Sequence, residues 1–333
     1  MKKLGIGVIG TGFMGQMHAS IFHDLPNAEL IGVTDQDPQR AKDLADKLGV
    51  KAFEDYHSLL KCSDIEAVSI CVSDHNHLEP TIASSEAGKH IFLEKPIATC
   101  LEDANTILKA TIKNNVRLTV GHLLRFDPKY LLLKQYVDEG GIGQPISIYT
   151  HRNSLITDGP VRYGHNGCLT LHVAVHDMDL ILWIMKKKVV RVYAERVSIA
   201  LKNIGIDDAI SATLKFEDGS IACMQYNWVL PSTFPTHIDA KMEIIGTKGY
   251  AAVDCANQGI CTCGNEGYRL PEATHWPELR GQVRGDLREE LSAFVDAILN
   301  KKEFAITPQE SINAVKLALA IMQSITEERV VIL

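Results

Sequence analysis

The chain has 333 residues, of which 46% are hydrophobic and 23% are charged, a composition typical of globular proteins. Its 34 basic and 41 acidic side chains give a formal net charge of −7, which argues against nucleic acid and against an anionic membrane surface as main partners. Because the length exceeds what one hydrophobic core usually covers, we predict two domains.

The sequence gives no sign of export or of membrane insertion. The N-terminal segment MKKLGIGVIGTG has two lysines before an apolar run, but glycines break that run and no cleavage site follows it. No stretch reaches the roughly 18 apolar residues that a membrane-spanning helix requires. The eight cysteines are scattered along the chain, which favours reduced thiols over disulfides. We therefore expect a cytoplasmic protein.

Up to residue 121, short apolar runs alternate with amphipathic segments. The apolar runs are mostly unbroken stretches of Val, Ile and Leu, as expected of strands covered on both faces. They are LGIGVIG, ELIGVTD, EAVSICV, HIFLEKP and VRLTVGH, and helical segments such as PQRAKDLADKLG and LEDANTILKATIKNN lie between them. This alternation predicts an α/β domain over 1–121, with a doubly wound parallel sheet of the Rossmann type.

The first of these strands leads into a glycine-rich turn, Gly10-Thr11-Gly12-Phe13-Met14-Gly15. In a strand–turn–helix unit, the first glycine permits the tight turn, the second lets the backbone approach a pyrophosphate, and the third lets helix and strand pack closely. The helix that follows offers unpaired N–H groups to the phosphates. We therefore predict a dinucleotide-binding turn formed by Gly10, Gly12, Phe13, Met14 and Gly15.

An aspartate, Asp35, ends the second strand and stands 20 residues past Gly15. A carboxylate at this offset accepts hydrogen bonds from the adenosine ribose hydroxyls and repels a 2′-phosphate. No arginine follows it directly, since Arg40 comes five residues later, in the next helix. The sequence therefore predicts NAD(H) as the cofactor in preference to NADP(H).

From residue 122 onwards the pattern changes to strands that alternate apolar and polar residues. Turn signals at Asp218-Gly219 and at 246–249 connect some of them. The runs are ISIYTHRN, VVRVYAERVSI, DAISATLKF, SIACMQYNW and THIDAKMEIIG. Helices are expected over 168–186, 286–300 and 308–326. We predict a second α/β domain over 122–333, built on an open, largely antiparallel sheet.

The helix over 168–186 carries a polar stripe in an otherwise apolar run. At about 100° per residue, Cys168, His172, His176 and Asp179 fall on one face, whereas Asp177 points elsewhere. Two histidines at i, i+4 spacing can share one zinc ion, although the intervening glutamate of the HExxH motif is missing. From the residues alone, this stripe can face a substrate, a metal or only other side chains.

Together, these motifs resemble the glucose–fructose oxidoreductase / inositol dehydrogenase (Gfo/Idh/MocA) family. The resemblance covers nearly the whole chain. It is carried by the glycine-rich turn and Asp35 and by the stretches SDHNHLEP, GKHIFLEKP, GHLLRFDP and HVAVHDMD. It implies a Rossmann domain, a second domain with an open mixed sheet, and oxidation or reduction of a polyol with a nicotinamide cofactor.

The resemblance also implies roles for residues of the first domain. Glu94 and Lys95, in the turn Glu94-Lys95-Pro96, match the family's EKP motif beside the nicotinamide, so Lys95 is expected to take part in proton transfer. Ser73 and His77 match a turn that contacts the cofactor. Ser73 stands where the family usually has proline, which makes this turn less restricted than its counterparts.

In the second domain, the resemblance places substrate contacts on the polar stripe. His176 matches the family's histidine, which accepts the hydroxyl proton, and Asp179 matches its last aspartate. His172 stands where the family has aspartate, a departure that leaves the identity of the substrate open and would suit an anionic sugar derivative. We expect substrate contact from this stripe and no metal, with metal binding and satisfied core histidines as the alternatives.

Four further residues are candidates for substrate binding. Arg125 follows the last strand of the first domain and either holds an anionic group or pairs with Asp127. Arg152 and Asn153 end the first strand of the second domain, and Tyr163 lies in a glycine-rich loop that we interpret as a lid.

The sequence therefore predicts an NAD(H)-dependent oxidoreductase that interconverts a secondary hydroxyl and a ketone on a sugar, a sugar derivative or a cyclitol. The alternatives are a non-catalytic NAD-binding sensor of the same fold and a metal-dependent enzyme that uses His172 and His176. Because an open sheet leaves an apolar face exposed, we expect a homodimer or homotetramer formed through the C-terminal sheet.

Overall fold

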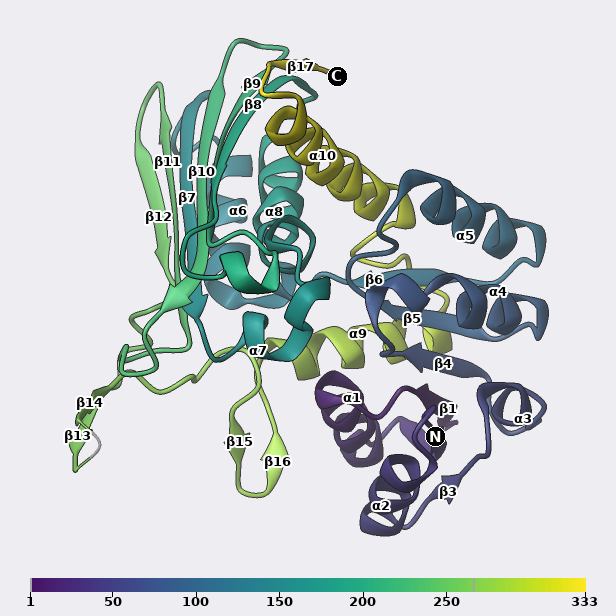
Figure 1. Ribbon diagram of the computed structural model, residues 1–333. Helices are drawn as coiled ribbons and strands as arrows, with labels where there is room; N and C mark the ends of the chain where they lie inside the picture. The colour runs from purple at the N-terminus through teal and green to yellow at the C-terminus, as the bar shows by residue number, and fades with distance from the viewer. Residues whose placement is uncertain (1, 266) are drawn as a thin grey trace. The chain divides into compact units, whose positions relative to one another are not determined.

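The computed structural model of the protein describes residues 2–265 and 267–333 (Figure 1). The chain forms two compact units. The first contains the residues up to Phe126 together with His275–Ile312, and the second contains Asp127–Thr274 together with Asn313–Leu333. No helix of the described residues is long and apolar enough to cross a bilayer.

The first unit is built on a six-stranded sheet in the order β3-β2-β1-β4-β5-β6, and every neighbouring pair is parallel. The strand order reverses between β1 and β4, which confirms the prediction of a doubly wound sheet. The strands are β1 (Leu4–Ile9), β2 (Ala28–Thr34), β3 (Lys51–Ala52), β4 (Ala67–Ile70), β5 (His90–Glu94) and β6 (Leu118–Gly121). The connecting helices are α1 (Phe13–Asp24), α2 (Pro38–Leu48), α3 (Tyr56–Leu60), α4 (Leu78–Glu86) and α5 (Leu101–Lys113).

A segment from near the C-terminus completes this first unit. It contains the hairpin β15–β16 (Glu278–Leu279 and Gln282–Val283) and helix α9 (Asp286–Asn300), whose bounds match the prediction. However, we predicted a single division at residue 121, with all of 122–333 in the second domain. The apolar stripe of α9 instead packs into the core of the first unit, through Leu287, Leu291, Phe294 and Val295. Periodicity identifies such a stripe but not the core that buries it.

The second unit is built on a seven-stranded sheet in the order β12-β11-β7-β10-β9-β8-β17. All neighbouring pairs are antiparallel except β7 and β10, which confirms the largely antiparallel prediction. The strands are β7 (Pro145–Leu155), β8 (Val189–Val197), β9 (Ala209–Phe216), β10 (Ile221–Leu230), β11 (Ile238–Gly246), β12 (Tyr250–Asp254) and β17 (Val331–Ile332). A small hairpin, β13–β14 (Thr262–Gly264 and Gly267–Arg269), extends from the same unit.

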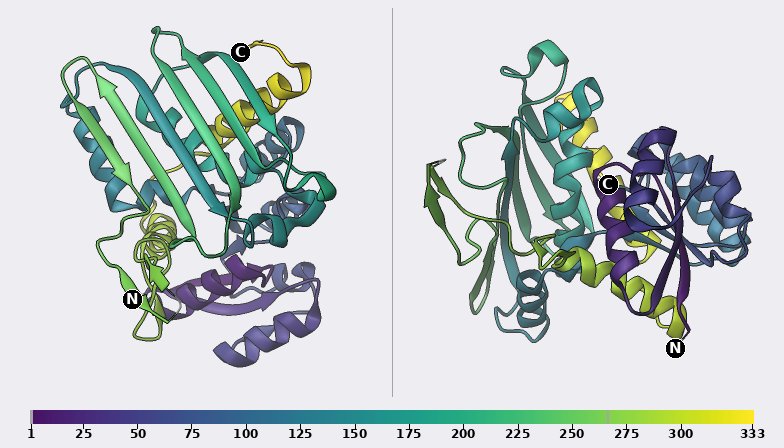
Figure 2. Two further views of the ribbon diagram at one scale, coloured as in Figure 1. Left: turned by 60° about the vertical axis from the view of Figure 1, so that its left-hand side comes forward. Right: turned by 90° about the horizontal axis from the view of Figure 1, so that it is seen from below.

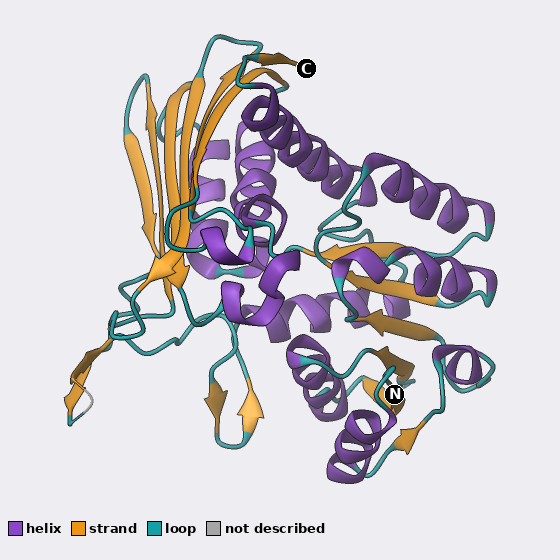
Figure 3. Cartoon of the chain, viewed as in Figure 1, coloured by secondary structure: helices purple, strands orange, loops and turns teal. Residues whose placement is uncertain are grey.

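Helices cover only one face of this sheet, as Figures 2 and 3 show. They are α6 (Pro128–Asp138), α8 (Val175–Met185) and α10 (Pro308–Glu327), whereas the short α7 (Gly159–Tyr163) lies in the loop after β7. Side chains alternate accordingly along β7, where Thr150 and Arg152 are buried and Tyr149 is exposed. The open face mixes exposed apolar side chains with charged ones, so our expectation of an apolar face is only partly correct.

The polar helix is not one continuous α-helix. Residues Thr170–Ala174 form a π-helical turn, and the α-helix α8 follows over Val175–Met185. A π-turn has more residues per turn than an α-helix, so the side chains before and after it are offset from the regular stripe that the sequence suggested. His172 lies within the π-turn, whereas His176 and Asp179 lie on α8.

Candidate functional site

The glycine-rich turn has the backbone geometry that a dinucleotide requires. Gly10 has φ +90°, and a Cβ atom there would lie 2.8 Å from the carbonyl carbon of Cys71. A Cβ atom on Gly15 would lie 1.8 Å from the Gly10 carbonyl oxygen, so neither position accepts a larger residue. Gly12, by contrast, has no atom within 4 Å of its Cβ position. The turn therefore leaves open space where a pyrophosphate approaches the start of α1.

Asp35 is held against this turn by hydrogen bonds. Its Oδ2 atom accepts bonds from the Thr11 main-chain N–H at 2.6 Å and from the Thr11 hydroxyl at 3.1 Å. Its Oδ1 atom accepts the Asp37 N–H at 2.9 Å and lies 3.8 Å from a guanidinium nitrogen of Arg40. The carboxylate thus lies beside the turn, with a basic side chain closer to it than the sequence spacing suggested.

The other predicted cofactor residues of the turn have different surroundings. Phe13 is 45% exposed and makes an edge-to-face contact with Trp276, with 6.0 Å between the ring centroids. Met14 packs against the core of the first unit. Phe13 is therefore the more accessible of the two side chains to a ligand.

The turn that carries Lys95 follows β5 and is held by a buried carboxylate. Glu94 is 7% exposed, and its Oε1 atom lies 3.2 Å from Nε2 of His18, a fully buried residue of α1. Its Oε2 atom accepts the main-chain N–H of Lys95 at 3.2 Å. Burial alone would lower the pKa of His18, but Cys71 and Glu94 raise it to about 10. Burial would raise the pKa of the Glu94 carboxyl, but the neighbouring His18 and Lys95 lower it.

Sequence reasoning missed His18 altogether. The signal that could have found it is a histidine three residues past Gly15, inside a helix that must pack closely against the first strand. A histidine placed there is buried and needs polar partners, and the carboxyl ends of neighbouring strands can provide them.

His77 was predicted to bind the cofactor, but both of its ring nitrogens face main-chain carbonyl oxygens. Nδ1 lies 2.8 Å from the Pro96 oxygen, Nε2 lies 3.2 Å from the Val72 oxygen, and the residue is 1% exposed. The structure therefore places His77 beneath the cofactor turns rather than on their surface. Ser73, in contrast, is exposed and precedes the short helix Asp74–Asn76.

These elements meet at one edge of the sheet of the first unit. The glycine-rich turn follows β1, Asp35 follows β2, Ser73 comes shortly after β4, and Lys95 follows β5. All of these strands are parallel, so their carboxyl ends lie at the same edge, and the strand order reverses between β1 and β4. Doubly wound sheets bind their ligands at this point.

In the second unit, the π-turn fixes the orientation of His172. The main-chain N–H of Cys168 donates a hydrogen bond to His172 Nδ1 at 3.1 Å, so the ring proton of the neutral imidazole lies on Nε2. Tyr163, from the loop that contains α7, stacks on the same ring, with 3.8 Å between centroids and an interplanar angle of 14°. His172 and the predicted lid residue Tyr163 are therefore brought together.

Below this turn, α8 is anchored to the sheet by a buried ion pair. Arg152 Nε and Nη2 donate to Asp177 at 2.8 Å and 3.2 Å, and Thr150 Oγ1 lies 3.3 Å from the same carboxylate. Burial opposes charge on the guanidinium, but Asp177 raises its pKa above the usual value. Our prediction that Arg152 contacts substrate has to be corrected, because its guanidinium lies in the interior beneath α8. His176 is half-buried, and Asp179 is 1% exposed.

Asn153 and Arg125 also differ from their predicted roles. Asn153 points to the open face of the sheet, opposite to Arg152, and donates a hydrogen bond to Asp239 at 2.8 Å. The reason is the two-residue period of β7, which puts consecutive residues on opposite faces. The Arg125 guanidinium is buried and pairs with Glu310 at 2.7 Å, a partner that neither of our two readings of Arg125 named.

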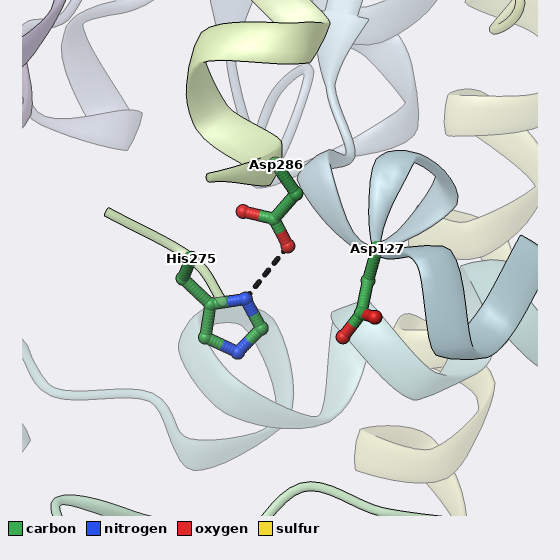
Figure 4. Close-up of side chains that lie close together, drawn as sticks. All are labelled: Asp127, His275 and Asp286. Carbon is green, nitrogen blue, oxygen red and sulfur yellow. Dashed lines mark hydrogen bonds and ion pairs between the residues drawn. The ribbon is translucent and has the colours of Figure 1, made fainter. Parts of the chain in front are cut away.

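A buried histidine–carboxylate pair lies where the C-terminal segment joins the first unit. His275 Nδ1 lies 2.7 Å from Asp286 Oδ2, as Figure 4 shows, and the His275 carbonyl accepts the N–H of Leu287 at 3.1 Å. The pair therefore fixes the start of α9. Asp127, drawn in the same figure, is the N-cap of α6 and accepts the Lys129 N–H at 2.8 Å.

Two family models match most of the chain. The model described as an oxidoreductase family with an NAD-binding Rossmann fold covers residues 4–122. The model of the GFO/IDH/MocA C-terminal domain covers residues 130–252. The first unit is thus that of an NAD-binding oxidoreductase.

Relatives of known name match over almost the full length. A myo-inositol 2-dehydrogenase of Thermotoga maritima is 29% identical, and the match covers 97% of each chain. An uncharacterized oxidoreductase of Bacillus subtilis is 28% identical over 97% of this chain and 95% of its own length. A scyllo-inositol dehydrogenase of Lactobacillus casei, solved with NAD(H) and scyllo-inositol, superimposes with a TM-score of 0.87 at 27% identity and 99% coverage of each chain.

Proposed function

Because the chain belongs to the Gfo/Idh/MocA oxidoreductase family, we propose that it interconverts a secondary hydroxyl and a ketone on a cyclitol, a sugar or a sugar derivative. The observation that carries this proposal is the gathering of the glycine-rich turn, Asp35 and the Lys95 turn at one sheet edge. The names of the relatives, which include two inositol dehydrogenases, favour a cyclitol or a similar polyol as substrate.

The residues of the first unit suit NAD(H). The nicotinamide supplies the redox chemistry by accepting a hydride from the carbinol carbon or returning it. Gly12 leaves space for the pyrophosphate, and the Asp35 carboxylate is positioned to accept hydrogen bonds from ribose hydroxyls. Phe13 and Ser73 complete the proposed cofactor surface, and Met14 and Glu94 support it from the interior.

The proton that leaves the hydroxyl group is assigned to Lys95 and His176. Oxidation of the alcohol releases one hydride to the nicotinamide and one proton from the oxygen, so a base has to take up that proton. His176 is half-buried on α8, and a neutral imidazole suits this role at neutral pH. Asp179 is proposed to act beside it.

His172 is proposed to bind substrate as a hydrogen-bond donor. The family has aspartate at this position, an acceptor, whereas the Cys168 N–H directs the ring proton of His172 to Nε2. The group opposite His172 then has to be an acceptor, such as a carboxylate, a carbonyl oxygen or a hydroxyl oxygen. A donor at this position therefore suits acidic sugar derivatives as well as the cyclitols that the relatives favour, and Tyr163 stacked on the ring keeps it in that orientation.

A homodimer or homotetramer in the cytoplasm remains part of the proposal. The uncovered sheet face carries exposed aromatic and aliphatic side chains, among them Tyr149, Tyr193, Ile245 and Tyr250. Charged residues such as Lys241 and Glu243 lie between them, which suits a specific contact with a second copy of the chain. A cytoplasmic location fits the eight cysteines, because the described residues form no disulfide.

The direct test is cofactor reduction with a panel of cyclitols, sugars, uronic acids and nucleotide sugars, with NAD and NADP in parallel. The proposal expects turnover with NAD on at least one polyol, loss of that turnover in Lys95→Ala, and unchanged NAD binding by that variant. Tight NAD binding without turnover on any substrate would contradict the proposal and favour a sensor. Activity that depends on added metal and not on NAD would favour a metal-dependent enzyme.

A further inference from the structure

Two buried histidines contact the turn that carries Lys95, one on each side of it. His18 lies on α1 and reaches Glu94, the residue before Lys95. His77 directly precedes α4 and reaches Pro96, the residue after Lys95. The two histidines are 0% and 1% exposed. The side chains that hold this turn are therefore shielded from water.

On the Glu94 side, the contact continues into the sheet. His18 Nδ1 lies 2.8 Å from Ser69 Oγ on β4 and 3.3 Å from Cys71 Sγ, while Nε2 faces Glu94. The remaining carboxylate oxygen of Glu94 accepts the main-chain N–H of Lys95. Hydrogen bonds to charged groups are stronger than those between neutral groups. One carboxylate thus fixes the main chain at Lys95 relative to both α1 and β4.

On the Pro96 side, the contact joins two turns. The His77 ring lies between the Pro96 and Val72 carbonyl oxygens. Burial lowers the pKa of His77 and favours its neutral form, which has a single N–H. The shorter contact, to Pro96 at 2.8 Å, is then the donated hydrogen bond. The turn after β5 is thereby tied to the turn after β4.

We propose that His18, Glu94 and His77 are positioning residues for Lys95, and that the opposite charges of His18 and Glu94 cancel at the residue next to it in the turn. The raised pKa of His18 and the lowered pKa of Glu94 agree with a pair that is charged on both sides at neutral pH. The other titratable groups that act on these residues are Cys71, Asp74, His77 and Lys95 itself. The effect of these residues on catalysis rests on the proposed dehydrogenase function, whereas their contacts with the Lys95 turn do not depend on it.

The cancellation of charge predicts opposite effects for two neutral substitutions. Glu94→Gln leaves the positive charge of His18 beside the lysine and disfavours its protonation, so the pH midpoint of lysine titration falls. His18→Gln leaves the negative charge of Glu94, so the same midpoint rises. A nearby charge moves such a midpoint by about one pH unit. The double variant Glu94→Gln/His18→Gln has neither charge and returns close to the wild-type value.

The experiment is an NMR titration of reductively ¹³C-methylated full-length protein with NAD bound, in which the Lys95 signal is assigned by its loss in Lys95→Arg. The same variants are assayed for the pH profile of kcat. We expect the pH midpoint of the Lys95 signal to fall in Glu94→Gln, to rise in His18→Gln, and to return close to the wild-type value in the double variant. Movement in one direction for both single variants, or no movement in either, would overturn the proposal. The double variant keeps the test valid if a buried unpaired charge unfolds one single variant.

His77→Phe tests the other side, because it fills the same space without an N–H. We expect kcat to fall about tenfold through misplacement of Lys95, with the NMR midpoint unchanged. Unchanged kcat would contradict a positioning role for His77. His23→Gln, on the exposed surface of α1, is the matched control and should change neither quantity.

The two readouts separate this inference from the proposed function. The NMR midpoint requires no turnover, so a protein inactive on every substrate would contradict the dehydrogenase proposal and still test the charge balance. An active enzyme whose midpoints do not move as described would contradict only the positioning proposal.

Discussion

The buried histidines of the two units have different kinds of partner. In the first unit, each ring nitrogen of His18 and of His77 faces a protein atom. His18 joins α1 to β4 and β5, and His77 joins the turn after β4 to the turn after β5. In the second unit, His172 is fixed at Nδ1 by its own helical turn and is stacked on an aromatic ring from a neighbouring loop. The kind of partner, more than burial, thus distinguishes the histidines that join turns and helices from the histidine whose ring is oriented by its own turn and a stacked aromatic side chain.

The largest effect is expected at Lys95, because its neighbours Glu94 and Pro96 are held by His18 and His77. Lys95→Ala should lower kcat by about 10³-fold, because a positioned proton-transfer group contributes about that much. NAD affinity, measured by fluorescence titration, should change little. Lys109→Ala, at an exposed position of α5, is the control. A nearly normal kcat in Lys95→Ala would contradict a role of Lys95 in proton transfer.

The buried pair beneath α8 should dominate stability in the second unit. Asp177→Asn leaves the Arg152 guanidinium without a counter-charge in the interior, and breaking a buried pair in this way costs about 3 kcal/mol. Chemical denaturation measures this loss directly. Asp46→Asn, at an exposed position of α2, should cost almost nothing. An equally small cost for Asp177→Asn would show that the pair does not anchor α8.

His172→Asp tests whether His172 selects the substrate, because it replaces a hydrogen-bond donor by an acceptor. We expect the ratio of kcat/KM between acidic sugars and neutral cyclitols to fall by about tenfold, because a buried acceptor now faces the acidic group. His237→Asp, at a side chain that is 76% exposed, should leave this ratio unchanged. A substrate profile identical to that of the wild type would place His172 away from the substrate.

A substitution of Asp35 tests whether charge sets the preference for NAD over NADP. Asp35→Ser removes the carboxylate that repels a 2′-phosphate and leaves Arg40, which lies 3.8 Å from it in the wild type. The preference for NAD over NADP, taken as a ratio of kcat/KM values, should fall about tenfold. The double variant Asp35→Ser/Arg40→Ala should gain less NADP activity than Asp35→Ser does. An equal gain in both variants would show that Arg40 does not contribute to NADP binding.

The smallest effect concerns the pH dependence of stability. The pKa of His18 is raised from 6.5 to about 10, by Cys71 and Glu94 against the effect of burial. Its contribution to stability is therefore complete below 6.5 and is lost as the pH rises towards 10. The difference in Tm between wild type and His18→Gln should thus be widest in mild acid and should narrow in alkali. A difference that widens with rising pH would contradict the charged pair.

Much of the first unit could be predicted from its sequence, because local chemistry determines it. Gly10 and Gly15 have no space for a Cβ atom, and the apolar runs of a parallel sheet have no other stable place than a covered interior. The partners of His18 and His77 could not be predicted. They depend on which strands become neighbours: β4 and β5 bring Ser69 and Glu94 to the His18 ring from more than 40 residues away along the chain, and the turn after β5 brings Pro96 to His77.

In the second unit, the sequence predicted the types of element, but not the face of the sheet on which each side chain lies. The alternation along β7 shows that Arg152 and Asn153 lie on opposite faces, yet it does not show which face the helices cover. The π-turn at His172 left no signal in the spacing that we considered, because its sequence also suits an α-helix. The assignment of α9 to the first unit likewise required tertiary packing.

Transfer of a hydride between a polyol and NAD can be followed with deuterium. A substrate that turns over is prepared with deuterium on the carbinol carbon, and the reduced cofactor is analysed by mass spectrometry. We expect the deuterium to appear in the reduced cofactor and Lys95→Ala to slow its appearance. Deuterium released to the solvent, with none in the cofactor, would contradict the account.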